Sequence, residues 1–152
     1  MRFLDAKKLP HKCYFFDCEQ VPTGEEVAAI LGKDAAQVFK TLVTTGKSGS
    51  HYVFMVPSVG ELDLKKAARA AGEKSIEMLK SKELLPLTGY VHGGCSPIGM
   101  KKFFTTFIDS SAKALPSIIF SAGRIGRQVE MTLDDLKKAV RLTECDLTAR
   151  TE

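Results

Sequence analysis

Two neighbouring runs of β-branched and aromatic residues, at positions 38–45 and 51–57, constrain the fold of this chain most strongly. The five residues between them include two glycines and two serines, a composition typical of a tight connection. Two such runs joined so closely predict an antiparallel hairpin. The chain is therefore not a uniform series of parallel strands, because each parallel crossover needs about a dozen residues or more.

Helical patterns alternate with further short strand patterns. Residues 23–32 begin with Thr23, have Glu26 three positions later and end at Gly32, which predicts a helix with a capping box and a glycine stop. The other expected elements are helices at 63–72 and 132–140, a helical turn at 81–84, strands at 75–79, 104–108, 117–120 and 128–131, and a strand end at 89–92.

This mixture indicates an α+β fold, with a mixed, curved and barrel-like sheet flanked by helices. The length of 152 residues suits one domain, which we expect to span residues 1–152. No repeat or long Ser/Gly linker divides the chain. Its N-terminus lacks the apolar stretch of a secretory signal, and no window holds the roughly 20 apolar residues that a membrane span needs. We therefore expect a cytoplasmic protein without membrane contact.

Neither a metal nor a nucleotide cofactor is expected. The chain lacks both common glycine-rich phosphate loops, and its four cysteines form no CxxC pair. The spacing of Cys13 and Cys18 matches no common zinc pattern, so free thiols are the preferred interpretation. A zinc site made by these two cysteines with His11 or His92 is the alternative.

Basic residues are concentrated in one stretch of the chain. The net charge is +4, and residues 99–127 hold five Lys and Arg side chains against one acid, Asp109. A local basic surface suits contact with phosphates, since each neutralised phosphate releases counterions. A solvated lysine-rich face would leave the same pattern, so charge alone does not separate the two interpretations.

The segment 93–99 is the strongest candidate for a ligand-binding loop. Three glycines and a proline within seven residues let main-chain N–H groups approach a ligand closely. Such a loop can hold a carbonyl oxygen or a phosphate without side-chain charge, and Lys101 and Lys102 follow at once. A tight turn after a strand is the simpler alternative, although seven residues exceed what such a turn needs.

Lys40 and Ser121 are further candidates. Lys40 lies where an apolar strand begins, so its ammonium either lines a pocket or belongs to the polar face of an edge strand. Ser121 opens a second small-residue loop, which is also the pattern of a hairpin turn with Arg124 and Arg127 at its tip. His92 lies beside the glycine-rich loop, and no Ser–His–acid set is evident.

Four segments are distinctive in their order and spacing: FKTLV at 39–43, ELDLKK at 61–66, GYVHGGCSPIG at 89–99 and SAGRIG at 121–126. Together they resemble the YbaK/EbsC family, whose members are free-standing relatives of the editing domain inserted in bacterial prolyl-tRNA synthetases. The resemblance covers residues 23–140. It implies a pocket that receives the 3′ end of a mischarged tRNA, with the lysine facing the glycine-rich loop across it.

The resemblance also implies a role for each matched position. Lys40 corresponds to the catalytic lysine, and the protein is expected to release cysteine from tRNA with the proline anticodon. The thiol of the substrate would attack its own ester carbonyl. Mischarged tRNA is the expected partner, with a transient complex with prolyl-tRNA synthetase and no DNA. The expected substrate-binding residues are Thr41, Gly93, Gly94, Ser96, Pro97, Ser121 and Gly123, and the expected phosphate contacts are Lys101, Lys102, Arg124 and Arg127.

Three alternatives remain at this level. The protein could be a deacylase that uses an oriented water against alanine or another small amino acid. It could be a regulatory module that binds nucleic acid or a small ligand without catalysis. It could also be a hydrolase with Cys95 as nucleophile. Some family members have an aromatic residue at Thr23 and an acid near Gln128, and Cys95 replaces a residue that is often aliphatic, so the shape of the pocket differs here.

Overall fold

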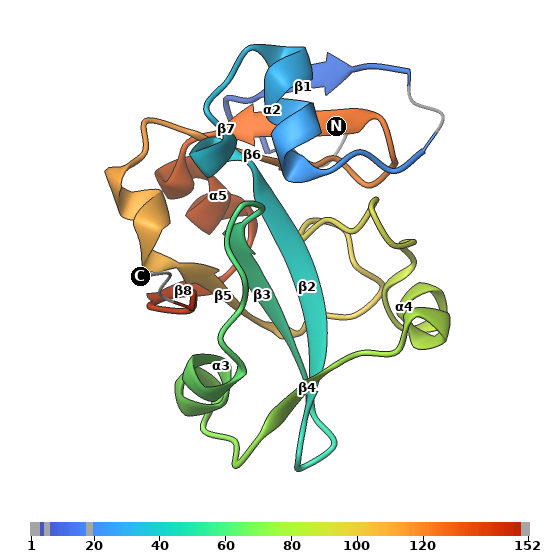
Figure 1. Cartoon of the computed structure of the whole chain (residues 1–152), viewed down its shortest axis with the longest axis vertical. Coiled ribbons are helices and arrows are strands. Elements are labelled where there is room, and N and C mark those ends of the chain that lie inside the picture. The colour runs from blue at the N-terminus through green and yellow to red at the C-terminus, as the bar shows by residue number, and fades with distance from the viewer. Residues whose placement is uncertain (1–3, 5–6, 18–19, 150–152) are drawn as a thin grey trace.

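The computed structural model describes residue 4 and residues 7–17 and 20–149 (Figure 1). Its helical segments are α2 (Gly24–Leu31), the short η1 (Ala35–Gln37), α3 (Leu64–Ala71), α4 (Ser81–Thr88), the short η2 (Ser110–Ala114) and α5 (Leu133–Ala139). Its strands are β1 (Lys12–Phe15), β2 (Phe39–Gly46), β3 (His51–Pro57), β4 (Ile76–Met78), β5 (Thr105–Asp109), β6 (Ile118–Ser121), β7 (Arg127–Met131) and β8 (Leu142–Cys145).

The strands form two sheets. The larger has the order β4-β2-β3-β5-β8; β2 pairs antiparallel with β3 and β4, whereas β3–β5 and β5–β8 are parallel. The smaller is antiparallel, with the order β1-β7-β6. An isolated parallel bridge from Val38 to Ile119 joins them. The mixed α+β architecture is confirmed, but the described strands do not close into a barrel.

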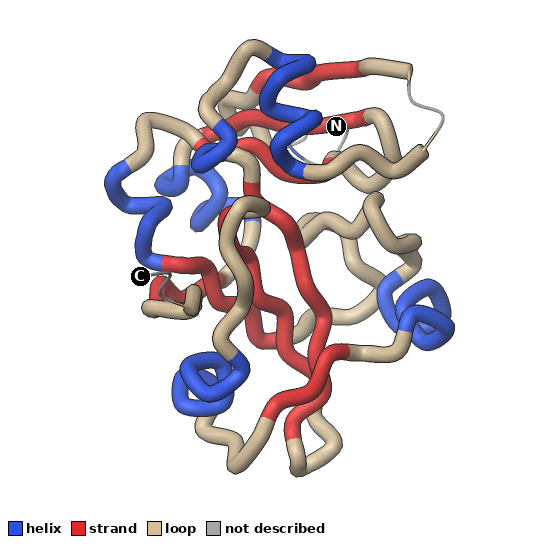
Figure 2. The backbone as a smooth tube through the Cα atoms, in the orientation of Figure 1, coloured by secondary structure: helices blue, strands red, loops and turns tan. Residues whose placement is uncertain are grey.

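Apolar faces of the helices cover the two sheets (Figure 2). α3 packs against the larger sheet through Ala67 and Ala68, which join Phe54, Val56 and Phe107 in a buried cluster. α2 packs near the smaller sheet, where its Val27 and Ala28 contact Val38 and Ile119. α5 contributes to the largest buried cluster, which β5, β6 and β7 share. α4 lies at the side of the molecule, joined to β4 and β5 by loops (Figure 1), and its Leu84 and Leu87 pack against a cluster that includes Val43 and Cys95.

Local sequence signals placed most elements correctly. Thr23 Oγ1 accepts a hydrogen bond from the Glu26 N–H, and the Glu26 carboxylate accepts one from the Thr23 N–H, which is the predicted capping box. Gly32 ends α2 with φ of 68°. The 46–50 hairpin and the α3 helix from cap Asp63 are also confirmed.

Three expectations at the edges of elements were wrong. β1 and β8 were not expected, because each is a short polar-looking strand that depends on its partner. The helical turn at 81–84 continues to Thr88, whose hydroxyl donates to the Leu84 carbonyl at 2.7 Å before Gly89 ends the helix. Residues 89–92 form a turn rather than a strand end. None of the helices in the described part of the chain is long and apolar enough to cross a bilayer.

Candidate active site

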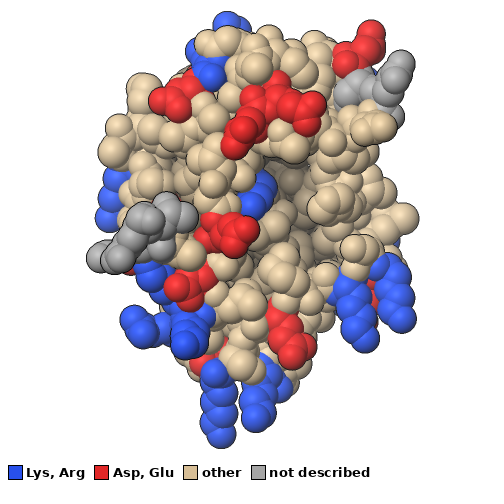
Figure 3. Space-filling model, in the orientation of Figure 1, with Lys and Arg blue, Asp and Glu red and all other residues tan. Residues whose placement is uncertain are grey.

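A cavity of about 530 Å³ lies along one edge of β2. Its walls come from six places in the chain: residues 21–27 around the start of α2, residues 38–43 of β2, Ser58 after β3, the segment 78–84, residues 92–95, and the β6–β7 pair. In the space-filling view, a hollow opens near the centre of the molecule (Figure 3). The cavity therefore forms where segments distant in sequence meet at one strand edge.

This edge of β2 is open because its neighbour is short. β4 pairs with β2 only at residues 44–46, and the Leu79 N–H then donates to the Val43 carbonyl at 3.1 Å. Along an extended strand, the main-chain groups of every second residue point to the same edge. The N–H and C=O groups of Thr41 therefore point to the same edge as those of Val43. No described strand lies beside them, so they can bind a ligand.

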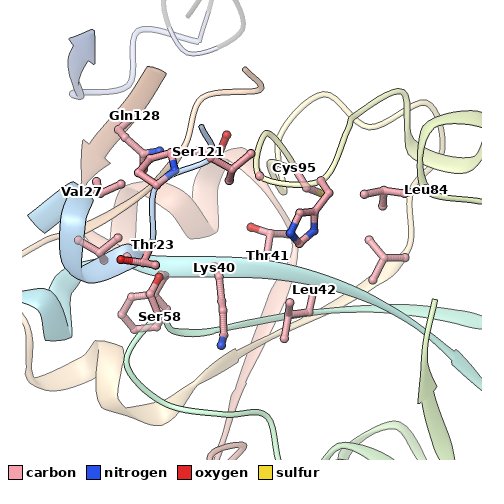
Figure 4. A pocket seen from close by; sticks show the side chains of 18 of the residues that line it. Thr23, Val27, Lys40, Thr41, Leu42, Ser58, Leu84, Cys95, Ser121 and Gln128 are labelled. Atoms are coloured by element: carbon pink, nitrogen blue, oxygen red, sulfur yellow. The ribbon is translucent and has the colours of Figure 1, made fainter. Parts of the chain in front are cut away.

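The hydroxyl of Thr41 is the clearest sign of a binding function. It is buried, and in the described part of the chain it has no hydrogen-bond partner. Figure 4 shows it on the side of β2 that faces Ser121 and Cys95. A buried hydroxyl without a partner costs about 1–3 kcal/mol. A ligand with a polar group at this position would remove that cost.

Lys40 lines the same cavity, but its direction differs from the expectation. In Figure 4 its side chain leaves β2 on the side opposite to the Thr41 hydroxyl, so the ammonium does not face the glycine-rich loop. The cause is strand alternation, because successive side chains of an extended strand point to opposite faces. The expected direct opposition of Lys40 and the loop was therefore wrong, although both border one cavity.

The glycine-rich loop divides into two parts. His92, Gly93 and Cys95 line the cavity. Gly94 instead packs against the main chain of Arg124 and Ile125, where an added Cβ would lie 3.3 Å from the Arg124 Cα. The first part of the loop can contact a ligand, and the second part holds the loop in place.

Ser96, Pro97 and Gly123 lie outside the cavity. The Ser96 hydroxyl accepts a hydrogen bond from the Ile98 N–H at 3.3 Å, which shapes the loop. Gly123 gives room to the Tyr90 ring, which an added Cβ would approach to 3.0 Å. The Tyr90 hydroxyl donates to the Ile98 carbonyl. These residues support the loop in this structure rather than contact a molecule in the cavity.

Ser121 ends β6 at the cavity wall. Its hydroxyl accepts a hydrogen bond from the Gly123 N–H at 3.2 Å and can still donate its own proton. The loop that follows is a hairpin turn between β6 and β7, as the simpler interpretation expected. Ser121 therefore offers a donor to a bound molecule opposite Thr41.

The four predicted phosphate contacts lie on the surface, outside the cavity. Lys101, Lys102, Arg124 and Arg127 are exposed. The Arg127 guanidinium lies 5.3 Å from the centre of the Phe15 ring. Lys102 lines a second cavity. All four are accessible to a large anionic partner.

Burial makes Cys95 an unsuitable nucleophile. Its side chain is 6% exposed, and burial raises the pKa of its thiol to about 12. The thiolate is the reactive form, so this cysteine is protonated near neutral pH and unreactive. Cys95 and Cys145 are free thiols, whereas Cys18 lies outside the described residues. In the described ranges, no three His, Cys, Asp or Glu side chains gather as a metal site.

Several cavity residues were missed by sequence reasoning. Ser58, Met78 and Leu84 line the cavity, yet no local motif marks them. The structure shows why position 24 needs a glycine: an added Cβ would lie 1.9 Å from the Ser58 Cβ. α2 and the end of β3 therefore meet closely at the cavity wall, a contact that no sequence spacing reveals.

Comparison with known proteins places this cavity among related ones. Residues 18–139 match the profile of the aminoacyl-tRNA editing domain. The chain is 46% identical over 132 residues to EbsC of Enterococcus faecalis, whose name proposes a Cys-tRNA(Pro)/Cys-tRNA(Cys) deacylase; the match covers 86% of this chain and 80% of EbsC. It is 27% identical over 97 residues to a proline–tRNA ligase of Pelobacter propionicus, covering 64% of this chain and 17% of the ligase.

A solved structure shares the fold over almost the whole chain. It is described as a proposed trans-editing enzyme for prolyl-tRNA synthetase. The two chains are 25% identical, with a TM-score of 0.87, and the match covers 98% of this chain and 94% of the other. The mixed sheet with its flanking helices is thus a fold already observed in nature.

Proposed function

The chain belongs to the family of aminoacyl-tRNA editing domains, and from this premise we propose that it is a deacylase that releases cysteine from mischarged tRNA with the proline anticodon. Support for the substrate comes from the name of the EbsC relative. Support for the site comes from one observation above all, the buried and unpartnered Thr41 hydroxyl in a cavity large enough for an esterified amino acid.

The cavity can hold the ester through uncharged groups. The Thr41 main chain and hydroxyl, the Ser121 hydroxyl and the main chain of Gly93 converge on the space between β2 and the loop. Such fixed dipoles stabilise charge that develops on a carbonyl oxygen. Lys40 adds a positive charge on the opposite face of β2 at the border of the same cavity, where it can hold the terminal phosphate of the tRNA and so fix the position of the ester.

The reaction needs no protein nucleophile under this proposal. The thiol sulfur of the substrate attacks its own ester carbonyl, a C–S bond forms, the C–O bond to the ribose breaks, and the ribose oxygen takes the thiol proton. The product is a cyclic cysteine thiolactone, and water then breaks its C–S bond to give free cysteine. Holding the thiol near the carbonyl can supply about 7–11 kcal/mol of the barrier. Attack by an oriented water on the same carbonyl is the other route, and it would not depend on a substrate thiol.

A deacylation panel tests the proposal. Purified protein is given tRNAs esterified with cysteine, alanine or serine, and the released amino acid is measured. We expect release of cysteine, with alanine and serine spared if the substrate thiol attacks. Comparable release of alanine would point to attack by water. No release from any of the three would contradict the assignment as a deacylase.

Replacing Lys40 tests its role within the same panel. Lys40→Ala is expected to lower kcat by about 10²–10³-fold or more, the scale typical of losing one electrostatic contact in an active site. Lys47→Ala, in the exposed hairpin tip, is the control and should leave the rate unchanged. A Lys40→Ala protein with full activity would remove the lysine from the mechanism.

The partners follow from the same proposal. Mischarged tRNA would enter the cavity by its 3′ end. A transient complex with prolyl-tRNA synthetase would pass the mischarged tRNA to this protein before the tRNA is used in translation. The protein would then act in the cytoplasm, where tRNA is charged. The likeness to a segment of a proline–tRNA ligase supports this pairing, since it indicates that editing and synthesis can belong to one chain.

A further inference from the structure

A second cavity, of about 540 Å³, is lined in part by the end of the same glycine-rich loop. The two share one loop: Cys95 lines the first cavity and Pro97 the second. Two residues of extended chain span at most ~7 Å. Along this loop, the linings of the two cavities therefore lie within that distance of each other, and we take them as subsites for successive parts of one ligand.

The second cavity combines an apolar floor with cationic sides. Ile98, Met100 and Val140 contribute apolar surface, and the Phe103 side chain is 66% exposed beside them. Lys102 and Arg141 also line the cavity, and no carboxylate is among its lining residues. A cavity lined by an exposed aromatic ring and two cations is suited to a flat, anionic ligand.

Within residues 99–127, which include Lys102 of this cavity, no exposed acid offsets the positive charge. Asp109 is the only acid among residues 99–127. It is 3% exposed, and its two carboxylate oxygens accept hydrogen bonds from the N–H groups of Leu147 and Ser111. The Asp109 carboxylate is thus held inside the protein. Lys113 pairs with Glu144 at 3.0 Å, whereas Lys102, which lines the cavity, is exposed.

We propose that the second cavity binds one unpaired nucleotide of the tRNA acceptor end, with its base stacked on Phe103 and its phosphate held by Lys102 and Arg141. The inference rests on the proposed function, which places the 3′-terminal ester in the first cavity. Nucleotides just before the terminal one are single-stranded, so their faces are free to stack on an aromatic side chain. The site would hold the RNA strand while the ester reacts.

The test compares Phe103→Ala with Phe103→Tyr, which keeps an aromatic ring. Binding of uncharged tRNA with the proline anticodon is measured by fluorescence anisotropy at fixed salt. Phe103→Ala should weaken binding about tenfold, the scale of losing one stacked base, whereas Phe103→Tyr should retain wild-type affinity. Equal binding by wild type and Phe103→Ala would overturn the proposal.

A shortened tRNA shows which part of the RNA the cavity holds. When the unpaired 3′ nucleotides are removed, wild type and Phe103→Ala should bind with the same affinity. A difference that persists would show contact with another part of the tRNA and overturn the proposal. If Phe103→Ala binds tRNA as well as wild type does but no longer binds prolyl-tRNA synthetase, the cavity is a protein-docking site. That result would also overturn the proposal.

Activity measurements separate this inference from the proposed function. Phe103→Ala should raise KM for intact Cys-tRNA about tenfold and leave kinetics on cysteinyl-adenosine, which has no preceding nucleotide, unchanged. Equal losses on both substrates would contradict a nucleotide site. If the wild type hydrolyses neither substrate, the deacylase assignment fails, and the tRNA-binding comparison still decides whether the cavity holds RNA.

Discussion

Thr41 and Lys40 are neighbours that border one cavity from opposite faces of a strand. The lysine is the residue that the family resemblance selects, yet the hydroxyl beside it shows the stronger structural sign of binding. Among the buried side-chain nitrogen and oxygen atoms of the described residues, it alone has no hydrogen-bond partner. A cost of this kind is retained where a ligand supplies the missing hydrogen bond.

The energetic cost of the unpartnered Thr41 hydroxyl predicts that Thr41→Val raises stability and lowers activity. Valine has nearly the same shape without the hydroxyl, so the free protein should gain about 1 kcal/mol of unfolding free energy. Release of cysteine should slow, because the bound ester loses a hydrogen bond. Urea unfolding and kcat/KM measure the two effects, and Thr41→Ser, which keeps the hydroxyl, is the control. A variant that is both less stable and fully active would contradict this interpretation.

At the scale of elements, one carboxylate ties the smaller sheet to its neighbours. Glu130 in β7 accepts hydrogen bonds from Tyr14 in β1 and from Ser117, just before β6. Lys33, after α2, lies 3.6 Å from the same carboxylate. Burial raises the pKa of Glu130, but the hydrogen bonds from Ser117 and Tyr14 and the charge of Lys33 outweigh it, so the pKa lies below its usual value.

The lowered pKa of Glu130 predicts how stability changes with acid. A carboxyl whose folded pKa is depressed stabilises the fold above its unfolded pKa of about 4.3, and this contribution is lost as pH falls through the folded pKa. Glu130→Gln should cost about 1 kcal/mol at pH 7, the difference between charged and neutral hydrogen bonds. Denaturation curves from pH 7 to pH 3 should show the two proteins converging below about pH 4.

Glu77→Gln provides the matched control for this experiment. Glu77 is an exposed side chain of β4, so its replacement should leave stability nearly unchanged at every pH. Parallel curves for wild type and Glu130→Gln, with a constant gap down to pH 3, would show that the charge of this carboxylate does not contribute to stability.

At the scale of the molecule, residues 99–127 carry an excess of four positive charges, whereas the first cavity is lined by one lysine, Lys40, and mostly uncharged groups. We therefore expect the basic stretch and the first cavity to have different roles. Under the proposed function, the exposed lysines and arginines would attract phosphates at long range, and the uncharged groups within the cavity would select the amino acid.

Salt dependence of tRNA binding tests this separation. Each phosphate contact that is lost should reduce the slope of log affinity against log salt concentration by about 1. Arg124→Gln should show this reduction in a salt titration while kcat stays unchanged. Lys65→Gln, an exposed position on α3, is the control and should keep the wild-type slope. An unchanged slope for Arg124→Gln would place the phosphate surface elsewhere.

The sequence by itself determined the local elements and the family. The capping box at Thr23, the stop at Gly32 and the 46–50 hairpin could be predicted, because their hydrogen bonds join residues only a few positions apart. The four spaced motifs also indicated the editing family, which the 46% identical relative supports. The roles of single site residues remain predictions.

Only the tertiary structure decided which groups face the cavity. β1 and β8 form because partner strands from distant parts of the chain complete their hydrogen bonds. The separate pairing of β4 with β2 stops at Met78 and leaves the edge of β2 open beside Thr41. Whether a strand edge is paired depends on contacts across the whole fold, and no local pattern of residues can carry that information.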